Sequence, residues 1–237
     1  PINKRALVIG GGLAGMSAAL GLGNQGFEVS LVEKASELGG FARKLHHTIE
    51  GADIQTHLKE MIADVEAHDK VEVITDAAIV EFEGFKGSFK TTVKVGTDNG
   101  TRKIDHGVII VATGATEYQP KEFLYGEDER VLTQVEFSDV LAQNGAADLD
   151  SVIMIQCVGS RNEENENCSR ICCQSAVKNA LEIKKLNPET NVYILYRDMR
   201  TYGLLEDYYK EARQTGVIFI RFDRHESPEV KKSKDGL

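Results

Sequence analysis

The segment RALVIGGGLAGMSAALGLGNQGFEVSLVE, residues 5–33, decides the fold of this chain. A short strand-like run at residues 5–9 is followed by a glycine-rich turn, a helical pattern to about residue 25 and a second strand at residues 28–32. Strands and helices that alternate in this order form βαβ units with parallel strands. The first part of the chain is therefore expected to be a doubly wound α/β domain.

The residues up to about 120 extend this unit into a layered domain. A helical repeat covers residues 54–68, and further strands are expected at 71–74 and 108–111. Three runs separated by turn residues predict an antiparallel meander laid over the sheet: 78–82, 89–95 and 102–105. The run at 108–111 is wholly apolar, which is typical of a central parallel strand covered on both faces.

A second βαβ unit starts near residue 151, after a turn-rich stretch that contains a short helix at 136–142. The elements expected in it are a strand at 151–156, a helix at 169–185, a strand at 192–196, a helix at 204–215 and a strand at 217–222. With a boundary near Ala146, the prediction is an α/β fold of two Rossmann-like three-layer domains, residues 1–146 and 147–237. Pro1 and the polar end at 231–237 resemble the cut edges of a longer protein, so the second domain is expected to be truncated.

Composition narrows the classes of function. The 237 residues are 41% hydrophobic, which is enough to bury a core, and the net charge of −9 argues against a nucleic-acid or anionic-membrane surface as partner. No run approaches the roughly 20 apolar residues of a membrane span, and the N-terminus carries no signal-peptide pattern. We therefore expect a cytoplasmic protein with no direct membrane span, whose cysteines serve redox or metal chemistry rather than disulfides.

The glycine-rich turn fits the pattern GxGxxG at Gly10, Gly12 and Gly15. Gly10 allows the tight turn, Gly12 lets the backbone approach a pyrophosphate, and Gly15 lets helix and strand pack closely. Glu33 follows at the end of the second strand, where a carboxylate can accept hydrogen bonds from ribose hydroxyls. The sequence of strand, turn, helix and acidic residue predicts a dinucleotide site.

Two further features favour FAD over NAD. A second glycine pair, Gly39 and Gly40, comes shortly after Glu33, and the sequence Ala112-Thr113-Gly114 ends a strand that follows the meander. With these features, residues 5–120 resemble the flavoproteins with two dinucleotide domains that include thioredoxin and glutathione reductases. The resemblance implies that the FAD contacts beyond the glycine triplet come from Leu13, Ala14, Glu33, Lys34, Gly39, Gly40, Arg43, Ala78, Ala112, Thr113 and Gly114.

The same resemblance gives these residues separate roles. Glu33 would bind the adenosine ribose, and the second glycine pair with Arg43 would lie along the diphosphate. The backbone near Ala78 would meet the adenine, and Thr113 with Gly114 would approach the diphosphate and the ribityl chain. Taken from the residues alone, Arg43 and Lys34 can equally be solvated surface charges.

All four cysteines of the chain lie close together in the second unit: Cys157, Cys168, Cys172 and Cys173. Cys157 ends the strand expected at 151–156, and the other three open the helix that follows. If that helix begins near residue 169, Cys168 and Cys172 lie about one turn apart and the four thiols can converge. Three interpretations of these cysteines remain open: a [4Fe–4S] cluster, a structural zinc site and thiols without a ligand. The flavin context and the lack of CxxC pairs favour the cluster.

Three segments carry a more specific resemblance: CVGSR at 157–161, CSRICC at 168–173 and YRDMRTYG at 196–203. They resemble the flavoprotein A subunit of heterodisulfide reductases and its relative in the quinone-interacting oxidoreductase of sulfate reducers. The resemblance implies an oxidoreductase with FAD and a [4Fe–4S] cluster on the four cysteines. It would relay electrons among iron–sulfur, hydrogenase or quinone-linked partner subunits. The chains of that family are longer, so this segment alone is expected to bind FAD weakly and need not be active.

Two rival functions remain open beside this one. Only Gly159 remains of a glycine fingerprint there, which makes NAD(P) a doubtful cofactor, and no cysteine pair follows Gly40. The rivals are an NAD(P)H-dependent flavin reductase of the thioredoxin reductase type and a zinc-stabilised, non-catalytic assembly module. Lys178, on the helix after the cysteines, is the candidate catalytic residue, because its ammonium could stabilise a reduced flavin or cluster; an ordinary surface lysine is the alternative.

Overall fold

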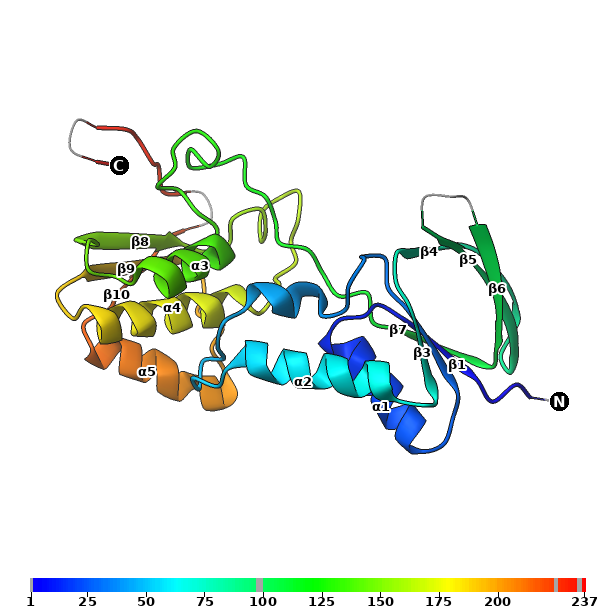
Figure 1. The fold of residues 1–237 in the computed structure, drawn as a ribbon. Coiled ribbons are helices and arrows are strands. Elements are labelled where there is room, and N and C mark those ends of the chain that lie inside the picture. The colour runs from blue at the N-terminus through cyan, green and yellow to red at the C-terminus, as the bar shows by residue number, and fades with distance from the viewer. Residues whose placement is uncertain (1, 97–99, 224–225, 234–235) are drawn as a thin grey trace. The chain divides into compact units, whose positions relative to one another are not determined.

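A computed structural model of the chain describes residues 2–96, 100–223, 226–233 and 236–237 (Figure 1). The chain forms two compact units. The first consists of the residues up to 45 together with 53–116, and the second consists of 46–52 together with 117–237. Pro1 and residues 234–235 of the polar end lie outside the described residues. Each unit has a parallel sheet and an apolar core of its own.

The first unit is built on a parallel sheet with the strand order β3-β2-β1-β7. Its strands are β1 (Ala6–Ile9), β2 (Val29–Val32), β3 (Val71–Ile74) and β7 (Val108–Val111). The connecting helices are α1 (Leu13–Asn24), the 3-10 helix η1 (Gly40–Lys44) and α2 (Ile54–Ala67). Because β1 pairs in parallel with both β2 and β7, the carboxyl ends of these three strands lie at one edge of the sheet.

Both faces of this sheet are covered. On one face, α1 and α2 bury Met16 and Val65 in a cluster that includes Val8 of β1. On the other face, Leu7 packs in a cluster with residues of an antiparallel meander. The meander consists of β4 (Ala77–Phe85), β5 (Ser88–Val95) and β6 (Gly100–His106). Successive residues of a strand point to opposite faces, so strands covered on both sides are apolar throughout.

The second unit contains a parallel sheet with the order β10-β9-β8. Its elements are α3 (Gln134–Asn144), β8 (Ser151–Ile155), α4 (Cys172–Leu186), β9 (Asn191–Tyr196), η2 (Gly203–Leu205), α5 (Glu206–Gln214) and β10 (Ile218–Arg221). The helices share one apolar cluster with the sheet, in which Ala176, Ile183 and Ile194 are fully buried. The side chains of Ile153 and Ile218, on the opposite face, are about half exposed. The described residues thus form two layers of this unit, where three are expected from the sequence.

The predicted α/β fold with two Rossmann-like units is confirmed, but two expected boundaries differ. The first unit ends near residue 116 rather than 146, because α3 packs its Leu141 and Phe137 into the core of the second unit. Segment 46–52 also belongs to the second unit, where Ile49 packs against the same core. The sequence shows the turn-rich composition of 117–150, but it does not show which core the segment joins.

Helix α4 begins at Cys172, three residues later than the expected start at 169. Arg170 has a φ of 64°, in the left-handed region, and a right-handed helix cannot pass through such a residue. Residues 156–171 therefore form a loop between β8 and α4. Cys168 lies in this loop and not in the first turn of the helix.

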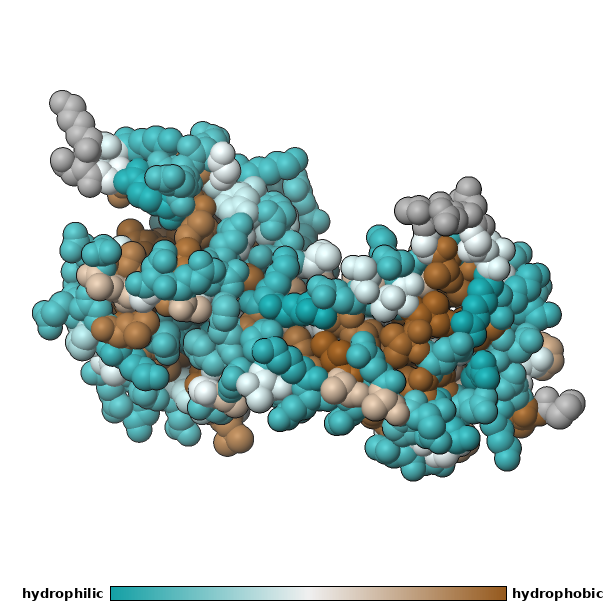
Figure 2. Space-filling model, in the orientation of Figure 1, coloured by the Kyte–Doolittle hydropathy of each residue, from teal (hydrophilic) through white to brown (hydrophobic). Residues whose placement is uncertain are grey.

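The surface is mostly polar. Figure 2 shows hydrophilic residues over most of the visible face, with apolar residues reaching it in patches. The exposed apolar side chains include Phe85 of β4 and Val111 of β7, each more than two thirds exposed. In the part of the chain that the structure describes, no helix is both long and apolar enough to cross a membrane.

The N-terminus of α3 generates a stability prediction. Thr133 Oγ1 accepts a hydrogen bond from Glu136 N at 3.2 Å, and Glu136 Oε2 accepts one from Thr133 N at 2.8 Å, which together form a capping box. Thr133→Ala is expected to lower the free energy of unfolding by about 1 kcal/mol, because one helix N–H loses its partner. Thr133→Ser keeps the hydroxyl and should retain most of the stability. Urea unfolding followed by circular dichroism measures both, and equal losses in the two variants would contradict the capping role.

Candidate functional site

The glycine-rich turn between β1 and α1 has the geometry expected of a pyrophosphate loop. Gly10 has a φ of 107°, and a Cβ on it would collide with the carbonyl of Ala112 at the end of β7. A Cβ on Gly15 would collide with the carbonyl oxygen of Gly10. A Cβ on Gly12 would meet nothing within 4 Å. Gly10 and Gly15 thus permit close packing of the backbone, and Gly12 faces open space beside the turn.

The second glycine pair packs onto this turn. Gly39 N donates to Gly11 O at 2.8 Å, and Gly12 and Gly39 form a parallel β-bridge. A Cβ on Gly40 would lie 3.1 Å from Gly12 Cα, so glycine at both positions lets the two turns touch. Two motifs that are far apart in the sequence therefore form one glycine-lined surface at the carboxyl edge of the sheet.

Glu33 ties the glycine turn to the end of β2. Its Oε2 accepts a hydrogen bond from Gly11 N at 2.5 Å, and its Oε1 accepts one from Ala35 N at 2.8 Å. The backbone carbonyl of Glu33 accepts a hydrogen bond from Ala77 N at 2.9 Å, which brings the start of β4, including Ala78, next to it. Glu33 and Ala78 are therefore neighbours at the carboxyl ends of β1 and β2.

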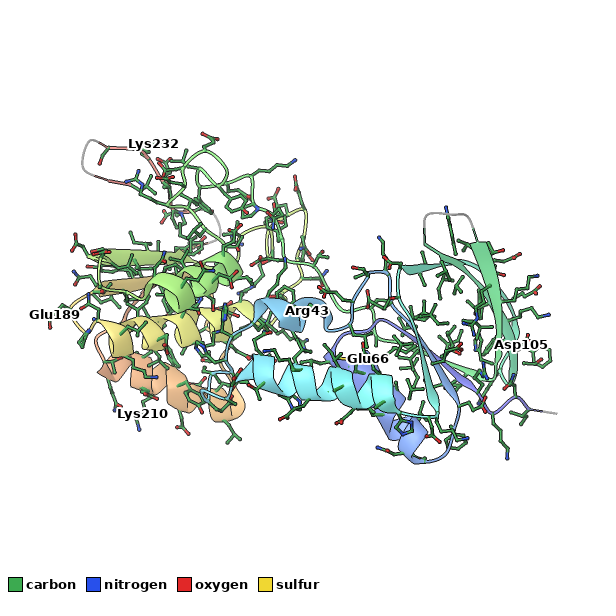
Figure 3. The ribbon with its side chains drawn as sticks, in the orientation of Figure 1. Arg43, Glu66, Asp105, Glu189, Lys210 and Lys232 are labelled. Atoms are coloured by element: carbon green, nitrogen blue, oxygen red, sulfur yellow. The ribbon has the colours of Figure 1, made fainter. Side chains whose placement is uncertain are left out.

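The remaining predicted FAD contacts divide into two groups. Arg43, labelled in Figure 3, lies on η1, and it donates from Nε to Leu38 O at 2.5 Å and pairs with Glu37 at 3.0 Å. Its guanidinium thus binds its own loop. The others surround the glycine turns and are at least partly exposed: Leu13, Ala14, Lys34, Ala112, Thr113 and Gly114.

The cysteines lie at the corresponding edge of the second unit, where β8 ends. Cys157 has a φ of 66°, and Cys172 and Cys173 open α4. Electrostatic and hydrogen-bond interactions link Cys157 with Cys172 and Cys172 with Cys173. The structure therefore brings three of the four predicted ligands together, one from the end of the strand and two from the start of the helix.

Hydrogen bonds to sulfur and burial shift the pKa values of these thiols in opposite directions. The Cys173 side chain lowers the pKa of Cys172, and backbone N–H groups of Cys157 and Cys173 lower it further. The hydrogen bond given to Cys172 raises the pKa of Cys173, and burial adds to that rise. Burial also raises the pKa of Cys157, although the backbone N–H of Arg197 opposes it. Hydrogen bonds, two of them from backbone N–H groups, thus favour the thiolate of Cys172 over those of its two neighbours.

Cys168 takes a different position. Its sulfur accepts a hydrogen bond from Arg170 N at 3.3 Å, inside the loop between β8 and α4. Across residues 2–96, 100–223, 226–233 and 236–237, no group of three or more His, Cys, Asp or Glu side chains is arranged to hold a metal ion. Cys157, Cys172 and Cys173 are therefore neighbours without forming a metal-binding arrangement in this structure, and the convergence of all four cysteines on one ion or cluster stays a prediction.

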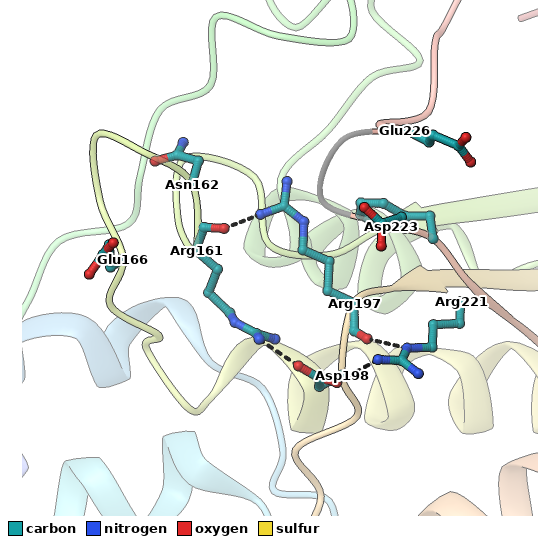
Figure 4. Close-up of a pocket in the computed structure, with 9 residues that line it drawn as sticks. Arg161, Asn162, Glu166, Arg197, Asp198, Arg221, Asp223 and Glu226 are labelled. Atoms are coloured by element: carbon teal, nitrogen blue, oxygen red, sulfur yellow. Dashed lines mark hydrogen bonds and ion pairs between the residues drawn. The ribbon is translucent and has the colours of Figure 1, made fainter.

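Three arginines, Arg161, Arg197 and Arg221, lie together around Asp198 and the loop that follows β8 (Figure 4). Arg161 Nη2 donates to Asp198 Oδ2 at 2.5 Å, and Arg221 Nη2 donates to Asp198 Oδ1 at 3.4 Å. Arg197 Nη1 donates to the backbone carbonyl of Arg161. These residues line a cavity of about 630 Å³ at the carboxyl ends of β9 and β10. The segment 196–203 follows β9 directly, and that position could have indicated that its side chains meet the loop after β8.

Buried polar atoms without partners gather in the same region. Within the described residues, the buried side-chain nitrogen and oxygen atoms that lack a hydrogen-bond partner are Gln156 Nε2, Arg161 Nη1, Arg197 Nε and Thr201 Oγ1. All four come from the loops that follow β8 and β9. Because buried polar groups are nearly always paired, such a concentration marks a place where an additional group can bind.

Lys178 binds inside the second unit. Its Nζ donates to the backbone carbonyl of His47 at 3.4 Å, and burial lowers its pKa while Glu182 partly restores it. In the same segment, His46 pairs with Asp139 at 2.6 Å. These contacts fasten segment 46–52 to α3 and α4. A catalytic role for Lys178 stays a prediction.

Comparison with known proteins agrees with these features. The sequence model of the family described as Pyridine nucleotide-disulphide oxidoreductase matches residues 4–154. The iron-sulfur A subunit of the CoB–CoM heterodisulfide reductase of Methanocaldococcus jannaschii is 31% identical over 93% of this chain and 48% of that protein. The A subunit of the H(2)/formate:CoB-CoM heterodisulfide,ferredoxin reductase of Methanococcus maripaludis is 30% identical over 97% of this chain and 50% of its own length. The resemblance to the A subunit of heterodisulfide reductases is confirmed, and the chain spans about half the length of these relatives.

Solved structures support the fold. Thioredoxin reductase from Lactococcus lactis superposes with a TM-score of 0.57 at 18% identity, over 98% of this chain and 68% of that one. An NAD-dependent persulfide reductase from A. fulgidus superposes with a TM-score of 0.55 at 16% identity, over 98% of this chain and 41% of that one. At these identities the likeness concerns the fold alone.

The approach of α1 to the glycine turn can be tested with two glycines of the same helix. Gly15→Ala is expected to lower the free energy of unfolding by about 1–3 kcal/mol, because the methyl group collides with the Gly10 carbonyl. Gly21→Ala meets nothing within 4 Å and should raise it by about 0.5–1 kcal/mol. Denaturant unfolding measures both changes. A stabilising Gly15→Ala would contradict the close packing described above.

Proposed function

The chain belongs to the pyridine nucleotide-disulphide oxidoreductase family, and on this premise we propose that it is an FAD- and iron–sulfur-dependent electron-transfer flavoprotein of the same type as the A subunit of heterodisulfide reductases. The proposal rests on what lies at the carboxyl ends of two strands, β1 in the first unit and β8 in the second. Joined glycine turns lie at the first, and thiols surrounded by N–H donors lie at the second. The first suits a dinucleotide and the second suits an anionic sulfur cluster.

FAD fits the first unit because the glycine turns leave backbone accessible to a diphosphate. Gly12 has free space beside its Cα, and Gly39 and Gly40 extend the same surface. Glu33 lies where ribose hydroxyls would be bound, although its carboxylate already accepts two backbone N–H groups. Glu33 would therefore fix the shape of the turn and present its remaining acceptor capacity to the ribose.

A [4Fe–4S] cluster fits the second unit in donor type and in charge. Such a cluster takes four thiolates and its potential depends on hydrogen bonds to the sulfurs and on nearby charge. Cys157, Cys172 and Cys173 would supply three ligands, and Cys168 would supply the fourth from its loop. The buried donors of Arg161 and Arg197 that lack partners suit a group with negative charge.

The chemistry is divided between the cofactors and the chain. When bound, FAD exchanges electrons in pairs or singly, and an iron–sulfur cluster exchanges them singly. The chain's own residues admit the diphosphate at Gly12, hold the turn through Glu33 and keep the thiols at the end of β8. No acid–base residue is needed for such a relay. Lys178, the proposed catalytic residue, would act by placing positive charge beside a reduced group.

The names of the relatives suggest partner subunits, and the free cysteines suggest a location. The relatives are named as A subunits of heterodisulfide reductases, so we infer that this chain works with other subunits, among them iron–sulfur and hydrogenase or quinone-linked proteins. The free cysteines fit a reducing compartment, which makes a cytoplasmic location the best-supported one. The substrates and the whole activity of the relatives belong to chains about twice the length covered here.

The cofactor content tests the proposal directly. The chain is purified and reconstituted with iron and sulfide without oxygen, separated from excess iron and sulfide by gel filtration, and then titrated with FAD, because weak FAD binding is expected of this segment. About four iron and four sulfide per chain, with broad absorption under the flavin bands, are expected for a [4Fe–4S] cluster. Zinc without flavin would favour an assembly module, and flavin bleached by NADPH without iron would favour an NAD(P)H-dependent reductase. Either of those results contradicts the proposal.

Cysteine variants locate the cluster. Cys157→Ser and Cys173→Ser are each expected to retain less than half of the iron, because both remove a soft thiolate from the set of ligands. Ser175→Ala is the control, since Ser175 lies on the same helix and binds only the Ile171 carbonyl at 3.2 Å. Iron analysis and absorption measure the outcome. Full iron in both cysteine variants would place the cluster elsewhere.

A further inference from the structure

We propose that Arg161, held in place by Asp198, is the counter-cation of the cysteine site and sets the reduction potential of the cluster bound there. The inference rests on the proposed function and concerns this chain's own residues. Arg161 contributes no ligand. Its positive charge acts on the group that the thiols hold. Asp198 serves to fix the direction of its guanidinium.

The Arg161 side chain is held at both ends. Its Nη2 donates to Asp198 Oδ2 at 2.5 Å, and its side chain is only 20% exposed. Its backbone N–H donates to the carbonyl of Asn167 at 3.2 Å, and its carbonyl accepts a hydrogen bond from Arg197. A charge that is largely shielded from water and fixed in direction interacts with its neighbours more strongly than a freely moving surface charge.

The guanidinium of Arg161 lies beside the thiol of Cys157, two residues after the end of β8. Arg161 and Cys157 interact through both charge and hydrogen bonding, and this interaction favours the charged form of each. Asp198 also connects to the second half of the site, because its backbone carbonyl accepts from Cys173 Sγ at 3.8 Å. Arg161 therefore lies beside Cys157, and Asp198 contacts both Arg161 and Cys173.

One hydrogen-bond donor of the Arg161 guanidinium is unpaired. Nη1 of Arg161 is buried and has no hydrogen-bond partner, and the same is true of Nε of Arg197. Leaving a buried charged donor unpaired is unfavourable, so an unpaired donor beside the Cys157 thiol favours the binding of an acceptor there. Thiolate or sulfide sulfur of a bound cluster is such an acceptor.

The sign of the effect follows from charge. One-electron reduction adds a negative charge to the cluster, and a fixed positive charge nearby stabilises the reduced state. Removing the charge of Arg161 should therefore make the potential more negative. Arg221 provides the matched control, because it pairs with the same Asp198 but is 72% exposed, and water screens its charge.

The test is an anaerobic redox titration of the reconstituted full chain, monitored by electron paramagnetic resonance and by absorption. Arg161→Gln is expected to reduce the one-electron equilibrium constant for reduction at least tenfold, about 59 mV more negative. Arg161→Lys keeps the charge and should recover at least half of the shift. Arg221→Gln should leave the potential unchanged. Iron and sulfide content and circular dichroism are measured for every variant.

The outcomes separate this inference from the function on which it rests. If the unaltered chain takes up no cluster, the proposed function fails. If the unaltered chain holds the cluster but Arg161→Gln shifts its potential no more than Arg221→Gln does, only the role of Arg161 is overturned. If Arg161→Gln is folded but holds no iron, retention of iron by Arg161→Lys supports the counter-cation role, and loss of iron from both variants overturns it.

Discussion

The structure depends on one close approach, that of helix α1 to the end of strand β1. Gly15 has no side chain, so the helix can lie against the carbonyl of Gly10, and Gly10 in turn fits under the carbonyl of Ala112. This packing directs the helix N-terminus at the carboxyl edge of the sheet, where backbone N–H groups favour an anion. The contact between the glycine turns at 10–12 and 39–40 and the position of Glu33 all follow from that geometry.

The second unit repeats the order of strand, loop and helix with different chemistry in the loop. The loop after β1 has glycine, Gly10, at its positive-φ position, whereas the loop after β8 has Cys157, Arg161 and Arg170 at positive φ, between 56° and 66°, besides Gly159. Left-handed backbone at residues with a Cβ costs roughly 1–3 kcal/mol each and persists where the surrounding structure fixes it. Three such residues in one loop, all close to thiols, fit a loop shaped to present sulfur rather than to bind phosphate.

The positions of many strands and helices could be predicted from the sequence, because apolar residues recur in it with clear strand and helix spacing. Strands β3 and β7 have the predicted bounds, 71–74 and 108–111, and α2 ends one residue before its expected end. The tight turn at Gly10 and the close packing of helix and strand at Gly15 were also predicted, from the GxGxxG spacing. The boundary at 146 and the start of α4 were wrong, because the core that α3 joins and the left-handed turn at Arg170 depend on tertiary contacts. Asp198 and Arg197 were missed for the same reason.

Segment 46–52 has a consequence for how this protein can be taken apart. It lies between stretches of the first unit but belongs to the second, with Ile49 in its core and Lys178 bound to His47. The backbone therefore passes from one unit to the other after residues 45, 52 and 116. Neither unit is formed by one continuous segment of the sequence. A chain truncated after residue 116 would keep segment 46–52 without the core into which Ile49 packs. A single proteolytic cut within 46–52 would leave the two units covalently joined through residue 116.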